Sequence, residues 1–494
     1  MVLTHKSRLV PIIAGSLVLF ATGCAVGPNF KKPAAPNVIG YTPTPISTTG
    51  STANVTGGEA QKLFDGRDIP GEWWTLFHSQ PLNDLIERSL KANPNLKAAQ
   101  AALIVARENV LAQRGAYYPS VTGGFSATRA KSSSNVSPVT NTSALNYSFY
   151  TPEVSVSFVP DVFGLNRRTV ESLQAQDQQA RFALAATHIT LSANVAGGAI
   201  QEASLRAQIE ATHELITINT DELDILRHQF ANGYVSRLDV AAQESQLAQV
   251  VATLPPLLKQ LAQQRDLLAA LSGGFPSQDL PEKFELSSLQ LPQELPLSLP
   301  SQLVEQRPDV REAEENLHSA SAQIGIAIAN RLPNFALTAD AGSMAVVLGH
   351  LFESGTGFWD VGASVAQPIF DGGTLLHRER AAKAAYTEAA EQYRSTVLTA
   401  FQNVADTLNA LQQDADALKA AAAAKDAAVV TLDLSKKQYQ SGYANYLALL
   451  SAEQAYQQAV INLVQAQANR YADTAALFQA LGGGWWNRPD VPKN

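Results

Sequence analysis

The chain has 494 residues, of which 46% are hydrophobic and 16% are charged, and this balance excludes an intrinsically disordered protein. The formal net charge of -8, without a basic stripe, argues against a nucleic-acid partner. A single cysteine excludes a disulfide framework and a cysteine-based zinc site. The length would suit about three domains, but an internal repeat favours two similar halves.

The first residues are typical of an export signal. Lys6 and Arg8 precede an apolar run from Leu9 to Ala21, which is too short to cross a bilayer as a helix. Small residues then lead to Cys24, the only cysteine, in a pattern that resembles a bacterial lipobox. We predict cleavage after residue 23 and a covalent lipid such as palmitate on Cys24. A plain secretory signal with an incidental cysteine is the alternative. Ala25 in the next position favours the outer membrane.

The chain repeats itself at an interval of about 210 residues. Four pairs of blocks keep the same order: 94–96 (PNL) with 308–310 (PDV), 118–119 (YP) with 332–333 (LP), 229–234 (QFANGY) with 438–443 (QYQSGY), and 271–275 (LSGGF) with 481–485 (LGGGW). Because chance identity would not preserve this order, we infer an internal duplication.

Each half predicts the same series of elements. A first helix covers Leu82 to Tyr117 and Pro300 to Arg331, and it stops at a proline. A second helix covers Leu165 to Ala231 and Thr374 to Gln440, and a glycine turn and a return helix follow it. At 1.5 Å per residue this helix would span about 100 Å, which favours a coiled coil or conduit. The pair Pro255-Pro256 predicts a kink or a split in the first return helix.

Four segments of about ten residues alternate between apolar and small or polar side chains. They include Val121 and Val154 in the first half and Phe335 and Trp359 in the second. This alternation predicts strands, and their length suits a tilted strand that crosses a bilayer. A strand of a soluble sandwich has the same pattern, but two hairpins behind an export signal favour the membrane. The Ser- and Asn-rich loop 131–147 is then expected outside the cell.

Four strands are too few to close a membrane sheet. Every backbone group in lipid must be paired, so such a sheet has to form a barrel, and known barrels start at eight strands. Several chains are therefore needed. Two chains would give eight strands with a filled interior, whereas three would give twelve strands and a water-filled lumen, which suits the small and polar residues of the alternating face.

Several motifs along nearly the whole chain resemble one family. Residues 24–30 (CAVGPNF) look like the mature start of the outer-membrane lipoproteins of tripartite efflux pumps, and Trp73-Trp74 with Phe77 is similar to the family's first helical region. Residues 160–164 (PDVFG) and 367–373 (QPIFDGG) resemble its two strand-to-helix junctions, and residues 233–240 (GYVSRLDV) resemble its periplasmic helix turn. The family is that of the TolC-like outer membrane factors, nodulation-protein T subgroup.

The resemblance implies a mixed α and β membrane protein. Its fold would be a trimeric twelve-stranded β-barrel, with four strands per chain, that continues into a long α-helical coiled-coil barrel. It also implies a passive exit duct in the outer membrane that extends into the periplasm. The implied partners are two further copies of the chain, a periplasmic membrane-fusion adaptor and an inner-membrane RND-type pump. No cofactor is implied beyond the lipid on Cys24.

The resemblance also places a gate at the periplasmic tip. Asp239 and Tyr439 match positions that link neighbouring coils in the family, although Ser236-x-x-Asp239 also fits a helix cap and Tyr439 also fits coil packing. The family's acidic ring is replaced by Ala448 and Ser451, and Leu447 offers a hydrophobic constriction instead. The gate residues are thus Asp239, Tyr439, Leu447 and Ser451. The predicted adaptor-docking tips are Asn232, Gly233, Tyr234, Val235, Ser236 and Arg237, and Ser441, Gly442, Tyr443 and Ala444.

We divide the chain into a signal peptide (1–23), a lipidated extended segment (24–81), a first repeat (82–274), a Pro-rich linker (275–299), a second repeat (300–484) and a tail (485–494). The sequence has no phosphate-binding loop, HExxH or nucleophile elbow, and its eight histidines are scattered. We therefore predict a duct without enzymatic activity or a metal site. The alternatives are a type I secretion channel, which shares the architecture, and a structural coiled-coil lipoprotein.

Overall fold

The computed structural model describes residues 25–131 and 146–489. The signal peptide, Cys24 and most of the loop 131–147 lie outside the described residues. The α-helices are α2 (Gln80–Ala92), α3 (Pro94–Arg114), α4 (Leu165–Ala231), α5 (Arg237–Leu271), α6 (Pro300–Gln306), α7 (Pro308–Ala329), α8 (Thr374–Gln440) and α9 (Tyr446–Ala480). The strands are β1 (Lys62–Asp65), β2 (Ser120–Lys131), β3 (Asn146–Phe158), β4 (Glu294–Leu297), β5 (Asn334–Ser343) and β6 (Gly357–Ala366). Short 3-10 turns lie at Trp73–Phe77, Gly115–Tyr117, Leu286–Ser288, Leu348–His350 and Trp485–Asn487.

The chain forms two compact units, which we describe separately. Unit 1 contains Ile104–Gln179 and Ala313–Tyr393 together with the described residues up to Pro33. Unit 2 contains Ala34–Leu103, Ala180–Glu312 and the described residues from Arg394 onward. Each unit therefore draws on both halves of the sequence repeat.

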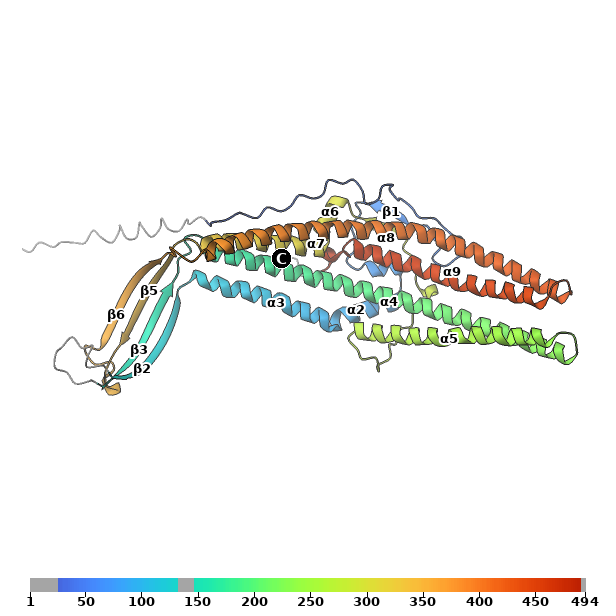
Figure 1. Ribbon diagram of the computed structural model, residues 1–494, viewed down its shortest axis with the longest axis horizontal. Helices are drawn as coiled ribbons and strands as arrows, with labels where there is room; N and C mark the ends of the chain where they lie inside the picture. Colours follow the sequence, from blue (N-terminus) through green and yellow to red (C-terminus); the bar gives the residue numbers. More distant parts are fainter. Residues whose placement is uncertain (1–24, 132–145, 490–494) are drawn as a thin grey trace, which may run out of the picture. The chain divides into compact units, whose positions relative to one another are not determined.

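The four predicted strands are confirmed, and in unit 1 they form one antiparallel sheet in the order β2-β3-β5-β6 (Figure 1). The pairing of β3 with β5 joins the two hairpins, with Val156 opposite Ala339. Apolar side chains on this sheet are exposed in the single chain, Trp359 to 77% and Val361 to 74%. Strands β2 and β6 are the two edges, and each pairs on one side only among the residues that the structure describes.

An aspartate a few residues before each of the helices α4 and α8 caps the first turn of that helix. The Asp161 carboxylate accepts the backbone N–H groups of Asn166 (2.8 Å) and Arg167 (2.9 Å) at the start of α4. Asp371 accepts those of Gly373 (2.9 Å) and Leu375 (2.7 Å) at the start of α8. These backbone bonds lower the pKa of Asp371. The aspartates of both junction motifs therefore have the same role, that of satisfying free helix N–H groups.

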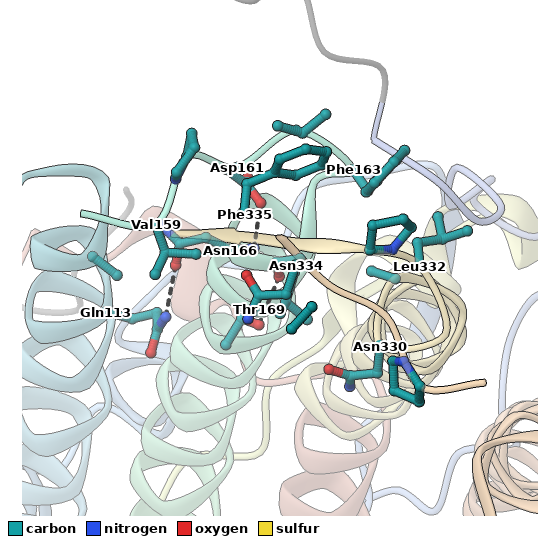
Figure 2. A pocket seen from close by; sticks show the side chains of 18 residues that line it. Gln113, Val159, Asp161, Phe163, Asn166, Thr169, Asn330, Leu332, Asn334 and Phe335 are labelled. Carbon is teal, nitrogen blue, oxygen red and sulfur yellow. Dashed lines mark hydrogen bonds between the residues drawn. The ribbon is translucent and has the colours of Figure 1, made fainter. Parts of the chain in front are cut away.

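A cavity of about 530 Å³ lies at these junctions in unit 1 (Figure 2). Residues that follow β3 and residues around the start of β5 line it, among them Asp161, Phe163 and Phe335. The Gln113 amide of α3 donates to Asn166 at 2.6 Å on one wall. The cavity thus lies where the helices and strands of unit 1 meet.

The residues after Cys24 are docked on unit 1. Val26 N–H donates to the Phe163 carbonyl at 3.1 Å, and the buried Arg168 side chain donates to the carbonyls of Val26 (2.9 Å) and Gly27 (3.2 Å). A Cβ built on Gly27 would lie 2.5 Å from Gly325 Cα, and Gly27 has a φ of +92°. The segment can come this close to α7 only because the residues on both sides of the contact are glycines.

Prolines interrupt the first helix of each half, so the predicted continuous helices Leu82 to Tyr117 and Pro300 to Arg331 are wrong. The chain leaves the helix at Asn93 (ψ 125°) and at Arg307 (ψ 120°), directly before Pro94 and Pro308. A proline ring clashes with a helical residue before it, which forces that residue into an extended conformation.

The long helices follow the prediction. Helices α4 and α8 have 67 residues each, and the return helices α5 and α9 have 35 each. Helix α5 runs through Pro255 and Pro256, so the predicted split is absent. Within the described part of the chain, α4 alone is long and apolar enough to pass for a membrane span, but 67% of its apolar window is buried in the protein, as in a core helix.

In unit 2 the N-terminal segment packs on α9. Strand β1 pairs in parallel with β4 of the Pro-rich linker, and the Trp73 ring stacks on Phe478 with ring centres 5.2 Å apart. Arg470 is 1% exposed and donates to the Glu59 carbonyl (2.9 Å) and the Gln61 side chain (3.1 Å). The segment predicted to be extended is therefore held in place by a buried aromatic cluster and a buried cation.

Candidate functional site

The two helix turns at the end of unit 2 are built alike (Figure 1). At the end of α4, Tyr234 N–H donates to the Gln229 carbonyl at 2.9 Å and Gly233 N–H to Phe230 at 2.9 Å. At the end of α8, Tyr443 donates to Gln438 at 2.9 Å and Gly442 to Tyr439 at 3.0 Å. This is the Schellman pattern, and it needs a left-handed residue that glycine supplies, with φ of +77° and +73°. The repeated glycine therefore encodes the two turns.

The return helices begin with different caps. In α5 the Ser236 side chain accepts the Asp239 N–H at 3.3 Å, and the Asp239 carboxylate accepts the Ser236 N–H at 2.9 Å. This is a complete capping box. In α9 the Asn445 side chain accepts the Ala448 N–H at 3.0 Å, and Ala448 cannot reciprocate. The first turn is thus more firmly fixed than the second.

An apolar cluster joins the hairpin α4–α5 to the hairpin α8–α9 near the turns. Its buried members come from three helices, namely Leu223 and Leu226 of α4, Val240 of α5, and Tyr446 and Leu449 of α9. Tyr439 of α8 is half-buried and meets Tyr446 edge-on, with ring centres 5.7 Å apart. The two hairpins are therefore packed against each other by side chains from all four helices.

A buried polar layer lies beside this cluster. The Tyr446 hydroxyl donates to the Gln243 amide oxygen, and the Gln243 nitrogen donates to the Asn219 backbone at 3.0 Å and to its side chain at 3.2 Å. Gln454 donates to Gln246 at 2.7 Å. Burial raises the pKa of Tyr446, which keeps its hydroxyl protonated as a donor. These bonds tie α9 to α5 and α5 to α4.

A buried and a half-buried carboxyl group lie in the same region. Glu453 of α9 is 4% exposed, and its side chain is hydrogen-bonded to Glu222 of α4. Burial first, and then the bond to Glu222, raise the pKa of Glu453 to about 9. Glu222 Oε2 and Glu453 Oε2 have no donor among the described residues. Two carboxylates in contact repel each other unless a proton lies between them.

The structure does not bring the four predicted gate residues together as one cluster within the chain. Asp239 caps α5, and the Tyr439 hydroxyl is buried without a partner among the described residues. The two are close enough for Asp239 to raise the pKa of Tyr439, after the larger effect of burial. Leu447 is 55% exposed, and Ser451 is exposed on the same helix. A link from these residues to a neighbouring copy stays a prediction.

The predicted docking tips lie at the two turns and are mostly exposed. Tyr234 and Tyr443 occupy equivalent positions and are exposed to 81% and 89%. Asn232, Gly233, Ser236, Arg237, Ser441 and Gly442 are exposed as well, whereas Val235 and Ala444 are half-buried. Two exposed tyrosines at the same position of both turns make a repeated surface feature, but their role in docking stays a prediction.

Comparison with known proteins gives the family. The model described as outer membrane efflux protein matches this chain over residues 85–274 and 299–483, more than half of its length. The toluene efflux pump outer membrane protein TtgF of Pseudomonas putida is 30% identical over 485 residues, 97% of each chain. The antibiotic efflux pump outer membrane protein ArpC of Pseudomonas putida is 29% identical over 472 residues, 94% of each. The crystal structure of the outer membrane protein VceC from Vibrio cholerae covers 84% of this chain and 100% of its own, with a TM-score of 0.78 and 27% identity.

The two similar halves of this chain together build long helices and one four-stranded sheet. This mixed fold is that of the outer-membrane channels. The chain belongs to the outer membrane efflux protein family. It is an outer-membrane component of an efflux system, and the predicted family, mixed α and β fold and outer-membrane location are confirmed. The relatives named above are efflux-pump proteins and not enzymes.

Sequence analysis missed the buried layer of Glu222, Glu453, Gln243 and Asn219. The repeat pairs Glu453 with Glu244, but Glu244 faces two arginines at the surface, with Arg227 at 3.2 Å and Arg237 at 3.3 Å. Equivalent positions of the duplication therefore have opposite environments. A hint lay in the glutamines of α9, because polar side chains on a coil's inner face predict buried networks.

Proposed function

We propose that three copies of this chain close into one passive exit duct across the outer membrane, lipid-anchored at Cys24. The observation that carries this proposal is the sheet of unit 1, which has two edge strands, β2 and β6, and exposed apolar side chains such as Trp359. In lipid the edges must be paired, and three copies of four strands would join β2 of one chain to β6 of the next. Twelve strands leave a lumen wide enough for water.

The proposed partners are a periplasmic membrane-fusion adaptor and an inner-membrane RND-type pump. The two equivalent turns with exposed Tyr234 and Tyr443 support docking of an adaptor that contacts both hairpins in the same way. The relatives support the assignment to a pump assembly, because TtgF and ArpC are both named as outer membrane proteins of efflux pumps.

The duct is proposed to leave the choice of exported compound to its partners. TtgF is named for toluene and ArpC for antibiotics, although both are about equally similar to this chain. Export of different compounds by proteins of one fold supports a conduit of low selectivity. We propose small apolar or amphipathic molecules as the exported class.

The first test is assembly and export. The protein extracted from outer membranes is expected to migrate as a trimer on an unheated detergent gel and as a monomer after heating, because closed membrane sheets resist detergent. A deletion strain is expected to become more susceptible to toxic apolar compounds, and expression of the full chain should restore resistance. A monomer that salt washes off the membrane would contradict the duct and favour the coiled-coil lipoprotein.

We propose that Asp239 and Tyr439 hold the periplasmic mouth closed by a bond to a neighbouring copy. The double variant Asp239→Ala with Tyr439→Phe is expected to raise single-channel conductance in planar bilayers several-fold, because both ends of the link are lost. Ser236→Ala is the matched control, since it breaks the capping box, at a cost of about 1 kcal/mol, and leaves the carboxylate. Equal conductance of the double variant and wild type, or an equal rise in Ser236→Ala, would contradict this gate.

A further inference from the structure

Glu222 and Glu453 form a contact between the two hairpins that the duct function does not explain. Glu222 lies on α4 and Glu453 on α9, next to the apolar cluster that packs the hairpins together. Oε2 of each carboxyl group is buried without a donor among the described residues, and the two side chains lie within hydrogen-bonding reach of each other. A bond between two carboxyl groups requires one proton, because a carboxylate can only accept.

We propose that Glu222 and Glu453 share one proton and that this proton clamps the hairpin α4–α5 to the hairpin α8–α9, so that the tip tightens as pH falls and loosens as pH rises. The inference rests on the proposed function, because it regulates the mouth of the same duct. The two residues of this clamp are distinct from the proposed gate residues Asp239 and Tyr439. The hydrogen bond of the clamp lies within one chain, whereas the proposed gate joins neighbouring copies.

The surroundings favour a proton as the occupant. The groups that interact with the pair come from two further helices: Lys436 and Tyr439 of α8, and Tyr446 of α9, while Asp239 of α5 acts on the two tyrosines. Lys436 is exposed and is the one cation among the charges that act on Glu453, so it offsets the burial only in part. Across the described residues there is no group of three or more His, Cys, Asp or Glu that could hold a metal ion. A proton shared between the two carboxyl groups removes their repulsion.

The sign of the pH effect follows from the two states. With the hairpins packed, the pKa of Glu453 is about 9, and its ordinary value, regained when water reaches a separated tip, is 4.5. At a pH between these two pKa values, the packing of the two hairpins against each other therefore takes up a proton. Its stability is greatest below the lower value and falls as pH rises toward the upper one. Within this interval, the ratio of separated to packed tips in one protomer should rise by up to roughly tenfold per pH unit.

The full-length trimer in planar bilayers provides the test. Wild-type open-channel occupancy is expected to rise with pH across the interval from about 5 to about 9. Glu453→Gln keeps the shape and a hydrogen-bond donor without a titrating proton, so its occupancy should be low and nearly independent of pH. Glu222→Gln should behave alike, which guards against a folding defect in one variant. Asp221→Asn, an exposed carboxylate next to Glu222 on α4, is the matched control and should keep the wild-type slope.

A second readout does not depend on conduction. Burial raises the pKa of Asp473 to about 7, so the spectra are taken above that value. Infrared difference spectra of the trimer at about pH 8 should show the carbonyl stretch of a protonated carboxylic acid, and this band should be missing in Glu453→Gln. Equal pH slopes in wild type and Glu453→Gln, or the same infrared band in both, would overturn the proton clamp while leaving the duct intact. An assembled trimer without conductance at any pH would overturn the duct, and the clamp as its regulator.

Discussion

Replacing Trp73 with alanine is expected to cost about 3–5 kcal/mol of unfolding free energy, because a fully buried aromatic ring leaves a cavity that cannot collapse. Trp73 is 0% exposed and contacts Trp74, Phe77 and Phe478. Its ring holds the segment before α2 against α9. The thermal midpoint of the helical circular dichroism signal in detergent should therefore fall clearly below that of wild type.

Two variants make this measurement specific. Trp73→Phe retains a ring on Phe478 and removes an indole N–H that is buried without a partner among the described residues, so it should restore most of the loss. Phe275→Ala removes a ring that is 72% exposed in the same unit and should leave the midpoint unchanged. A midpoint of Trp73→Ala equal to that of Phe275→Ala would show that the cluster does not stabilise the unit.

Replacing Gly27 with leucine is expected to detach the residues after Cys24 from α7. The new Cβ would lie 2.5 Å from Gly325 Cα, and a leucine at φ +92° is strained as well. Backbone strain of this kind costs about 1–3 kcal/mol, and overpacking costs a similar amount. Limited proteolysis of the assembled protein should cut the segment 25–33 many times faster in the variant than in wild type.

The chain supplies its own control for this experiment. Gly40 lies in the same N-terminal stretch, but a Cβ there would meet nothing closer than an oxygen of Thr42 at 3.8 Å. Gly40→Leu should therefore leave the cleavage of 25–33 as in wild type. If Gly27→Leu were cut no faster than Gly40→Leu, the close glycine contact would not be what holds the segment.

Local patterns were enough to predict most elements of this fold. The glycine at Gly233 and Gly442 and the alternation around Val121 and Trp359 each have a local cause, so the turns and the strands could be placed from sequence. The helix breaks before Pro94 and Pro308 had a local signal too, but the apolar periodicity on both sides concealed it. The prolines separate two helices that follow each other directly in sequence.

The buried polar groups could not be predicted in the same way. Glu453 and Glu244 are repeat equivalents, and only the packing of the helices buries the first and leaves the second half-exposed beside two arginines. Arg470 likewise has the composition of a solvated helix residue, but it lies beneath a segment from the other end of the chain. The burial of such residues depends on contacts between segments that are hundreds of residues apart in the sequence. The local periodicity of apolar residues carries no information about these contacts.

The sheet of unit 1 has a consequence for how the protein is made. A newly exported chain carries two edge strands, β2 and β6, whose outer backbone groups are unpaired. Such edges can pair with the exposed strand of any other chain. In the proposed trimer, completion of the fold is therefore an association of separate molecules, and it depends on their concentration in the periplasm. A cell that makes too few copies would lose them to degradation before they found one another.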